Sequence, residues 1–340
     1  SSGTPGVVRY YGCPAEESLI GKVFMARDGA FDDLDAAFNF HPWNSNSPNK
    51  GSFNALDNLK FHFHGRAAHA GASPHLGRSA LDAVELMNVG ANYLREHVEP
   101  EVRIHYVITN GGDLPNVVPA EAEVWYFVRA PRRTQLEKVT DRLRRIAQGA
   151  AMMTETEVEE TYITGCYDLL NNSYLADLQY EAMREIGPIR FTDDEIAFAG
   201  RINSGYPEET RQSVFKSLRL PDDLRELPLI AENFPANDEG KVQAGSSDVG
   251  DASWIAPLSL LNTTCCPSGV PLHSWGMAAS AGTSIGHKGM MHAAKIMALS
   301  AVALYSDPER VRKARDEFEK ATGGRAYRSP LPAGAKPPLA

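Results

Sequence analysis

Between residues 58 and 165, apolar residues recur at every second position in some stretches, as in strands, and at every third or fourth position in others, as in helices. Residues 59–64 alternate between apolar and polar side chains, as a half-buried strand does. The helix that follows carries Ala80, Val84, Met87 and Ala91 on one face. The predicted order is strand, helix, strand, strand, helix, strand, at residues 59–64, 80–98, 102–110, 122–128, 134–150 and 154–164. This order is typical of a ferredoxin-like α+β sandwich.

The residues on either side of this unit show the pattern of an α/β sheet. Residues 35–41 have the composition of a buried strand that Pro42 ends, and a helical segment precedes them. Residues 43–56 are polar and rich in turn formers, so we expect a linker and a domain boundary there. We therefore predict an α/β domain made of residues 1–57 and 166–340, with residues 58–165 inserted as a second domain. Residues 200–245 hold four prolines and are expected to be irregular.

The start of the second helix in the inserted unit is predicted from a local motif. Thr134 and Glu137 have the spacing of a capping box, in which each side chain bonds to the backbone of the other residue. We therefore expect the helix to begin at Thr134.

Two adjacent carboxylates, Glu16 and Glu17, follow a Gly/Pro break near the start of the chain. The run Val7 to Tyr11 before them is typical of a strand, and residues 18–25 can form a helix. Neighbouring side chains diverge at such a junction. One carboxylate can therefore bind a divalent metal ion while the other accepts a proton from water. The alternative is an acidic pair in the first turn of a helix, where the helix dipole favours it.

Composition argues against several classes of protein. The net charge of −9 argues against a nucleic-acid or anionic-membrane partner. The longest apolar helical stretch, residues 296–305, is about half the length that a membrane span needs. The four cysteines are scattered without a C-x-x-C pair, which favours a reducing cytoplasm over a disulfide scaffold or a zinc ribbon. Residues 1–6 are neither basic nor apolar, which argues against a signal peptide.

Two histidines are candidates for metal ligands. His41 lies at the carboxyl end of a predicted strand, where α/β sheets bind ligands. His273 follows an apolar stretch and the adjacent cysteines. A single histidine in an apolar setting is more often structural, so neither residue defines a site by itself. His62 and His64 share one face of a strand, but no carboxylate or cysteine accompanies them, and we interpret them as surface or interface residues.

Several peptides resemble signatures of one family, the aminoacylase/carboxypeptidase family of metal-dependent amidohydrolases. The peptides, in the order that the family has them, are Pro14-Ala15-Glu16-Glu17, Gly65-Arg66-Ala67-Ala68-His69-Ala70-Gly71, Gly111-Gly112-Asp113-Leu114-Pro115-Asn116 and Leu272-His273-Ser274. The resemblance implies an α/β, zinc-exopeptidase-like catalytic domain with an inserted ferredoxin-like lid that serves as the dimerisation domain.

The resemblance also implies roles for residues at the metal centre. Glu17, His41 and His273 would bind metal, and the family holds two divalent ions, zinc or manganese. These nitrogen and oxygen donors suit either metal. Glu16 would act as the general base.

Three further residues would bind the substrate, again by resemblance. His69 would stabilise the oxyanion and reach across a dimer into the partner's site. Asn116 and Arg129 would hold the substrate carboxylate, a task that suits the fork of an arginine side chain.

The implied activity is hydrolysis of a small-molecule N-acyl amino acid, foremost an aroyl-glutamate, by a homodimer or together with a related second subunit. Family members begin with a further segment that holds the first sheet strands and another metal-ligand loop, and the printed sequence starts after it. A second interpretation therefore stays open, in which the chain is a catalytically silent binding protein or partner subunit with an incomplete metal site.

Overall fold

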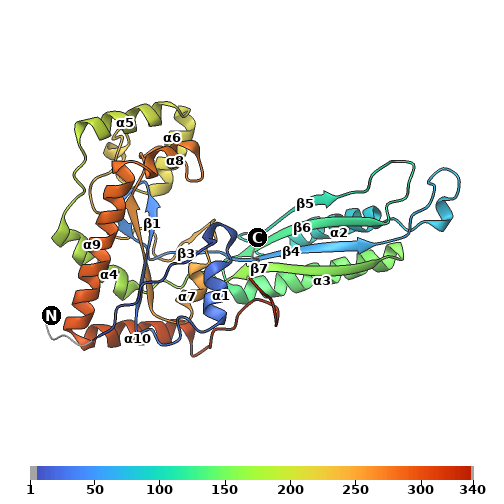
Figure 1. Ribbon diagram of the computed structural model, residues 1–340, viewed down its shortest axis with the longest axis horizontal. Helices are drawn as coiled ribbons and strands as arrows, with labels where there is room; N and C mark the ends of the chain where they lie inside the picture. The colour runs from blue at the N-terminus through green and yellow to red at the C-terminus, as the bar shows by residue number, and fades with distance from the viewer. Residues whose placement is uncertain (1–5, 338–340) are drawn as a thin grey trace.

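The computed structural model describes residues 6–337, which form two parts. One part, which we call the lid unit, is a four-stranded sheet covered by two helices, and it projects to the right in Figure 1. The other part, on the left, is a layered α/β structure made from the segments before and after the lid unit. Ser1–Pro5 and residues 338–340 lie outside the described residues. The expectation that the chain has no signal peptide concerns the first of these two segments. Within residues 6–337, no helix is both long and apolar enough to cross a bilayer.

The lid unit has the predicted order of elements. Its sheet order is β5-β6-β4-β7 with all neighbours antiparallel, which is the ferredoxin-like arrangement. The elements are β4 (Ala55–His64), η2 (Pro74–Leu76), α2 (Ala80–Leu94), η3 (Arg95–His97), β5 (Arg103–Asn110), β6 (Glu121–Ala130), α3 (Arg133–Thr154) and β7 (Glu157–Cys166).

One face of the lid sheet is covered by α2 and α3, and the other face is open (Figure 1). Leu59, Phe61 and Phe63 of β4 are buried under the helices with Val84 and Met87 of α2. The residues between them on β4 lie on the open face, because side chains alternate along a strand. The predicted alternation and the predicted apolar face of α2 are confirmed.

The α/β part is built around a sheet of order β1-β9-β2, in which β1 and β9 are parallel. Every residue of β9 is buried, as expected of a strand with helices on both faces. Leu261 packs against α4 and α9, whereas Leu258 and Leu260 pack against α1 and α7. The elements are η1 (Glu16–Ser18), α1 (Gly21–Arg27), β1 (Ala37–Trp43), β2 (Ser47–Pro48), β3 (Ser52–Phe53), α4 (Ser173–Ile186), α5 (Asp193–Ser204), α6 (Glu208–Leu218), η4 (Asp222–Leu224), β8 (Val242–Gln243), α7 (Val249–Ser253), β9 (Leu258–Thr264), α8 (Trp275–Ala281), α9 (Ser284–Ser306) and α10 (Pro308–Thr322).

The polar stretch at residues 43–56 is not the linker that we expected, because most of it is buried. The Asn44 amide donates to the carbonyls of Pro267 and Val270, and the Asn46 amide donates to the carbonyls of Ala231 and Glu232. Polar side chains are tolerated inside a protein when they are hydrogen-bonded in this way. The proposed domain boundary at residues 57/58 stays a prediction.

Two strand predictions near the start of the chain are wrong. β1 continues through Pro42 to Trp43, because β1 has only β9 beside it in the described sheet and an edge strand tolerates the missing N–H of proline. Val7 to Tyr11 is not a strand, and Val7 and Val8 are each 77% exposed. No strand of residues 6–337 pairs with this run, so its backbone lacks the ladder that a strand needs.

Helix starts also differ from the prediction. α3 begins at Arg133, not at a Thr134–Glu137 box, and the Asp168 carboxylate accepts from the Arg133 N–H at 2.7 Å. That distant carboxylate takes the place of a local cap.

Residues 200–245 include the end of α5 and all of α6, so they are not irregular throughout. α5 starts at a capping box formed by Thr192 and Glu195.

A buried polar network fastens the lid sheet to α3. Asp57 of β4 is 1% exposed and pairs with the Arg133 guanidinium at 2.6 Å. It also accepts from the hydroxyls of Thr140, at 2.6 Å, and of Tyr162 on β7. Burial and the neighbouring Asp57 carboxylate both raise the pKa of Tyr162, which keeps that hydroxyl a donor. The four side chains therefore tie two strands to one helix.

We predict that Asp57→Ala lowers the free energy of unfolding by roughly 3–5 kcal/mol, because it leaves the Arg133 charge buried without its partner. The matched control, Thr140→Val, removes a single hydrogen bond and should cost about 1 kcal/mol. Urea denaturation of the two variants measures the difference. Equal losses would show that the ion pair is not what holds these elements together.

Candidate active site

The two adjacent glutamates lie on a tight turn in front of α1. The turn is η1, and the residues on either side of it, Ala15 and Leu19, have left-handed backbone with φ of 55° and 54°. A Cβ at Gly21 would lie 1.8 Å from the Pro14 carbonyl oxygen, so only glycine allows this close approach. The predicted helix from residue 18 therefore starts later, at Gly21. This geometry excludes the first turn of α1 as the location of the glutamates.

A buried ion pair holds this turn against the loop before α7. The Lys22 ammonium lies 2.7 Å from Asp248, and the Lys22 backbone N–H donates to the same carboxylate at 2.8 Å. Burial raises the pKa of Asp248 more than Lys22 lowers it. The neighbouring Ser247 hydroxyl donates to Glu16 Oε1 at 2.7 Å. Glu16 is thereby oriented by residues more than two hundred positions away in the sequence.

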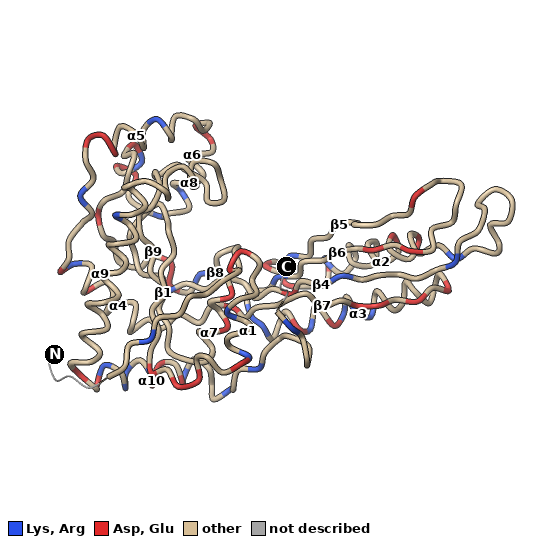
Figure 2. The backbone as a smooth tube through the Cα atoms, in the orientation of Figure 1, with Lys and Arg blue, Asp and Glu red and all other residues tan. Residues whose placement is uncertain are grey.

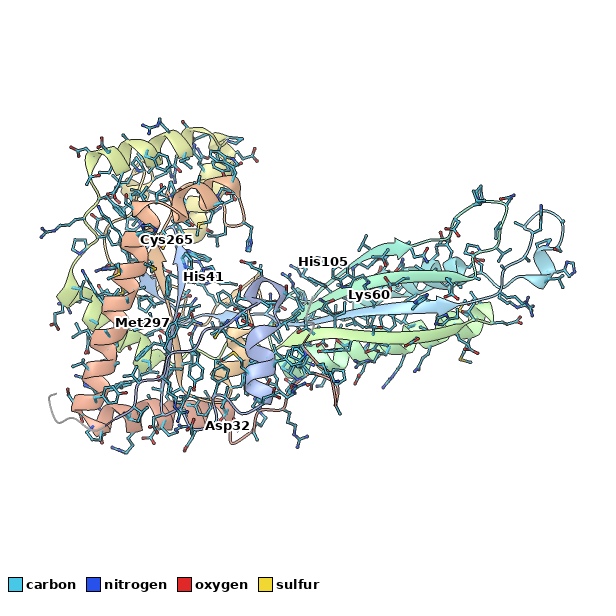
Figure 3. All side chains as sticks on the ribbon, in the orientation of Figure 1. Asp32, His41, Lys60, His105, Cys265 and Met297 are labelled. Carbon is cyan, nitrogen blue, oxygen red and sulfur yellow. The ribbon has the colours of Figure 1, made fainter. Side chains whose placement is uncertain are left out.

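A cavity of about 620 Å³ opens beside this turn, and four of the seven predicted site residues line it: Glu16, Glu17, His41 and His273. It is bounded by β1, by the loop after β9 and by the start of α8. Figure 3 labels His41 on β1. The rest of the wall is mostly apolar, with Phe40, Pro42, Phe53, Leu260, Leu272, Trp275 and Met277.

The predicted metal ligands are only partly assembled. His273 Nδ1 lies 3.5 Å from Glu17 Oε2. His41 Nδ1 lies 2.8 Å from the Pro42 carbonyl oxygen and donates to it, which leaves Nε2 free as a ligand. Within residues 6–337, however, the one group of three potential ligands with atoms mutually within 4.8 Å is elsewhere, so His41 is not in reach of the other two. The donor types fit a divalent ion, and two of the three donors meet.

Residues with a strained backbone conformation lie in and near the segments that line this cavity. Of the five non-glycine residues with positive φ in residues 6–337, three are Ala15, Leu19 and His273, the last with φ of 57°. A bulky residue in this conformation costs of order 1–3 kcal/mol, and such residues cluster at functional sites. The strain is independent support for a site at the turn and at His273.

An aromatic shelf closes one side of the cavity. The rings of Trp275 and Tyr206 stack with centroids 5.1 Å apart and planes 5° from parallel. The Tyr206 hydroxyl donates to Ser274 at 2.8 Å and accepts from the Gly276 N–H at 2.8 Å, which fixes the stack. Trp275 remains 55% exposed and lines the cavity.

Arg129 lies at the end of β6 nearest the α/β part, outside the residues that line the cavity. Its guanidinium donates to the Ala244 carbonyl at 3.3 Å, three residues before Ser247. Its Nε is buried and makes no hydrogen bond within the described chain. An unsatisfied cationic donor therefore lies near the loop that orients Glu16.

His69 and Asn116 lie at the opposite end of the lid sheet, in two segments that we call the distal loops (residues 65–79 and 111–120) (Figure 1). The loops are joined by hydrogen bonds from Ala70 N to Asn116 O and from Val118 N to Ala68 O. The backbone N–H groups of Gly71 and Ala72 donate to His69 Nδ1, so Nε2 carries the proton. β6 has ten residues and spans about 30 Å. Neither residue is at the cavity of its own chain.

Three contributors to the site could not be predicted from the sequence, and the surroundings of one pair of histidines outside the site differ from the prediction. Ser247 and Trp275 lie beside Asp248 and His273, but no local pattern assigns them a role, and the Lys22–Asp248 pair joins distant segments. His62 and His64 do have a carboxylate beside them, that of Glu121, because the pairing of β4 with β6 places it there.

Comparison with known proteins identifies the family of the chain. Residues 53–152 match the peptidase dimerisation domain of the M20 family. The chain is 41% identical to the B subunit of the p-aminobenzoyl-glutamate hydrolase of Escherichia coli K12, over 98% of this chain and 72% of that protein. It is 32% identical to the A subunit of the same hydrolase from that organism, over 55% of this chain and 44% of that protein.

A solved structure has the same fold. The chain resembles the aminobenzoyl-glutamate utilization protein of Klebsiella pneumoniae with a TM-score of 0.56 and 19% identity, over 86% of this chain and 60% of that one. The family expected from the sequence is confirmed by the dimerisation domain and by the match to the Escherichia coli hydrolase. The chain therefore belongs to the M20 family of peptidases and amidohydrolases, together with the B subunit of p-aminobenzoyl-glutamate hydrolase.

Proposed function

We propose that this chain hydrolyses the amide bond of an N-acyl amino acid, most specifically an aroyl-glutamate such as p-aminobenzoyl-glutamate. The observation that carries the proposal is the meeting of Glu16, Glu17 and His273 in one cavity, with Glu16 oriented by Ser247. The relatives are hydrolases by name. We place the protein in the cytoplasm, where its four free cysteines stay reduced.

Each residue of the cavity has a separate task in this proposal. The family's divalent ions, zinc or manganese, would be held by Glu17, His41 and His273 and would polarise the amide carbonyl. Glu16 accepts a proton from the attacking water and returns it to the leaving amine. The Ser247 hydroxyl donates a hydrogen bond to Glu16 Oε1, so Oε2 is the oxygen that accepts the proton from water.

We predict that Glu16→Gln keeps the metal content and lowers kcat by ~10²–10⁴-fold, the usual contribution of a general base. Glu17→Ala should instead lower the metal content. Elemental analysis and steady-state kinetics on both variants measure the two effects. Equal loss of metal in the two variants would contradict this division of roles.

The wall of the cavity supports an aromatic acyl group, and Arg129, outside that wall, supports an acidic amino acid. The exposed face of Trp275 and the apolar wall suit an aryl ring, because stacked aromatic groups attract one another beyond simple burial. Arg129, with its unbonded Nε, suits the carboxylate of the amino acid. An aroyl-glutamate has both features.

We predict that Trp275→Ala lowers kcat/KM for p-aminobenzoyl-glutamate by about 2- to 12-fold, which corresponds to ~0.5–1.5 kcal/mol of aromatic stacking. The value for N-acetyl-glutamate, which lacks the ring, should change little. Trp275→Phe is the matched control and should keep most of the preference. A parallel fall for both substrates would remove the role of Trp275 as an acyl-group shelf.

Two copies of the chain are proposed to share their sites. β5 is an edge strand that exposes Tyr106, Val107 and Ile108. The neighbouring helix α2 exposes Val89 and Tyr93. An edge strand with apolar side chains is unfavourable in water unless another strand pairs with it. The opposite edge, β7, is acidic and suits solvent better.

The direction of β5 explains why such a dimer would complete the site. Two identical β5 strands related by a two-fold axis pair antiparallel, so the distal end of one lies beside the inner end of the other. The distal loops of one copy, with His69 and Asn116, are thereby carried towards the α/β part of its partner. His69 would then donate its Nε2 proton to the oxyanion, and Asn116 would join Arg129 at the substrate carboxylate.

We predict that mixing His69→Ala protein with Glu16→Gln protein restores activity well above the low residual activity of each variant alone. At equal amounts the mixture should reach about a quarter of the wild-type rate, since half of the dimers are mixed and each holds a single intact site. Activity measured after subunit exchange, with exchange followed by a fluorescent label, tests this. A monomeric protein, or no recovery after complete exchange, would contradict the shared site.

A second candidate function is that of a binding protein or partner subunit. The observation that favours it is the separation of His41 from Glu17 and His273. In this case the second chain would be a related one, as the names of the two Escherichia coli relatives suggest, since they are given as two subunits of one hydrolase. Absence of bound metal at the cavity, in a protein that binds p-aminobenzoyl-glutamate, would favour this candidate over the hydrolase.

A further inference from the structure

The open face of the lid sheet holds a cluster of two histidines and a glutamate outside the cavity. His62 and His64 lie two residues apart on β4, and their rings stack with centroids 4.6 Å apart. Glu121 of β6 is paired with His64 in the strand register. Its Oε2 lies 2.9 Å from His62 Nε2 and 2.8 Å from His64 Nδ1. Three potential ligand atoms thus converge from two strands.

The charge around this cluster is negative. Glu159 of β7 lies 3.7 Å from the other ring nitrogen of His64. Lys60 is the lysine of β4, and Figure 3 labels it. Its ammonium pairs with Glu123, at 2.8 Å, and not with Glu121 or Glu159. Within residues 6–337, no lysine or arginine forms an ion pair with Glu121 or Glu159. Figure 2 shows acidic and basic residues interspersed along the lid unit.

Hydrogen bonding does not account for the cluster. His62 Nε2 is shielded from solvent and has no hydrogen bond of acceptable geometry, although the Glu121 oxygen is close to it. A buried ring nitrogen in a native protein normally has a partner. A cation between the three atoms would satisfy the nitrogen and both carboxylates together.

We propose that His62 Nε2, His64 Nδ1 and Glu121 Oε2 bind a divalent cation of the zinc type on the lid unit. Two imidazoles and a carboxylate suit such an ion, with water in the fourth position. Ligand distances of about 2.0–2.2 Å place ligand atoms roughly 3.3 Å apart in a tetrahedron, so the side chains need to part by about half an ångström. Glu159, 3.7 Å from His64 Nε2, is near enough to accept from the Nε2–H after a small side-chain shift, which would hold the ring in the orientation that binds the ion.

The position of this site suggests what the ion does. His64 is the last residue of β4 and Glu121 is the first of β6, so the ligands lie at the base of the two distal loops. The Gly65 N–H already donates to the Ala120 carbonyl at 2.7 Å between the same two strands. The ion adds a second link there and fixes the loops that carry His69 and Asn116. The benefit to catalysis rests on the proposed function, but binding of the ion does not.

The test is a titration of the EDTA-treated full chain with cobalt(II) chloride, followed by visible absorption. His41→Ala and His273→Ala are introduced first, so that the cavity contributes no metal. This background should bind a single equivalent of cobalt with the intense bands of a four- or five-coordinate ion. Adding His64→Asn should weaken binding by more than about tenfold, since even an outer-shell change typically costs 10–100-fold. The matched control is His97→Asn, an exposed lid histidine outside the cluster.

The outcomes are distinct from those of the activity assays, because the titration does not depend on turnover. No cobalt binding in the background, or equal binding by the His64→Asn and His97→Asn proteins, would overturn the site. If the background does not fold, the same substitution in the wild-type chain should remove one equivalent from the total. Hydrogen exchange with and without cobalt then tests the effect on the distal loops. Unchanged exchange there would overturn the link to His69 and Asn116.

Discussion

The buried pair of Lys22 and Asp248 is the interaction on which the site depends. Both groups are withdrawn from water, so each needs the other, and removing one would leave an uncompensated charge inside the protein. The pair joins the start of α1 to the loop before α7 and so fixes the turn that carries Glu16 and Glu17. Ser247, next to Asp248, extends the same contact to Glu16. The strained backbone at Ala15, Leu19 and His273 is held in place by this surrounding structure.

The lid unit holds the polar groups of the distal loops at one end of its long strands, away from the α/β part of its own chain. Three of its four strands have ten residues, two helices cover the sheet, and the Asp57–Arg133 network joins the sheet to α3. The distal loops at the outer end are tied to each other by backbone hydrogen bonds. The residues of the distal loops do not line the cavity of their own chain. The exposed apolar edge at β5 is the physical reason for proposing a second chain.

The lid unit could be predicted from the sequence because its signals are local. The alternation along β4 and the apolar face of α2 each report burial directly. Features that depend on distant residues could not be predicted. Asp168 caps α3 from another segment, so the Thr134–Glu137 motif was misleading.

The candidate site shows the same division between local and distant signals. The Glu pair and His273 are recognisable as short motifs, and they do meet in one cavity. Their support by Lys22, Asp248 and Ser247 is a tertiary contact that no motif encodes. The Glu121 carboxylate beside His62 and His64 follows from strand register alone, which the pattern of a single strand does not contain.

We propose that one functional site contains both the cavity of one chain and the distal loops of a partner chain. Hydrogen–deuterium exchange on the Glu16→Gln protein, saturated with p-aminobenzoyl-glutamate, is the decisive measurement because this variant should bind the ligand and consume it far more slowly than the wild type. We expect slower exchange in the cavity segments, residues 12–22 and 271–278, together with slower exchange in the distal loops, residues 65–79 and 111–120. Protection of the cavity with unchanged distal loops in a proven dimer, or protection of the lid unit alone, would contradict it.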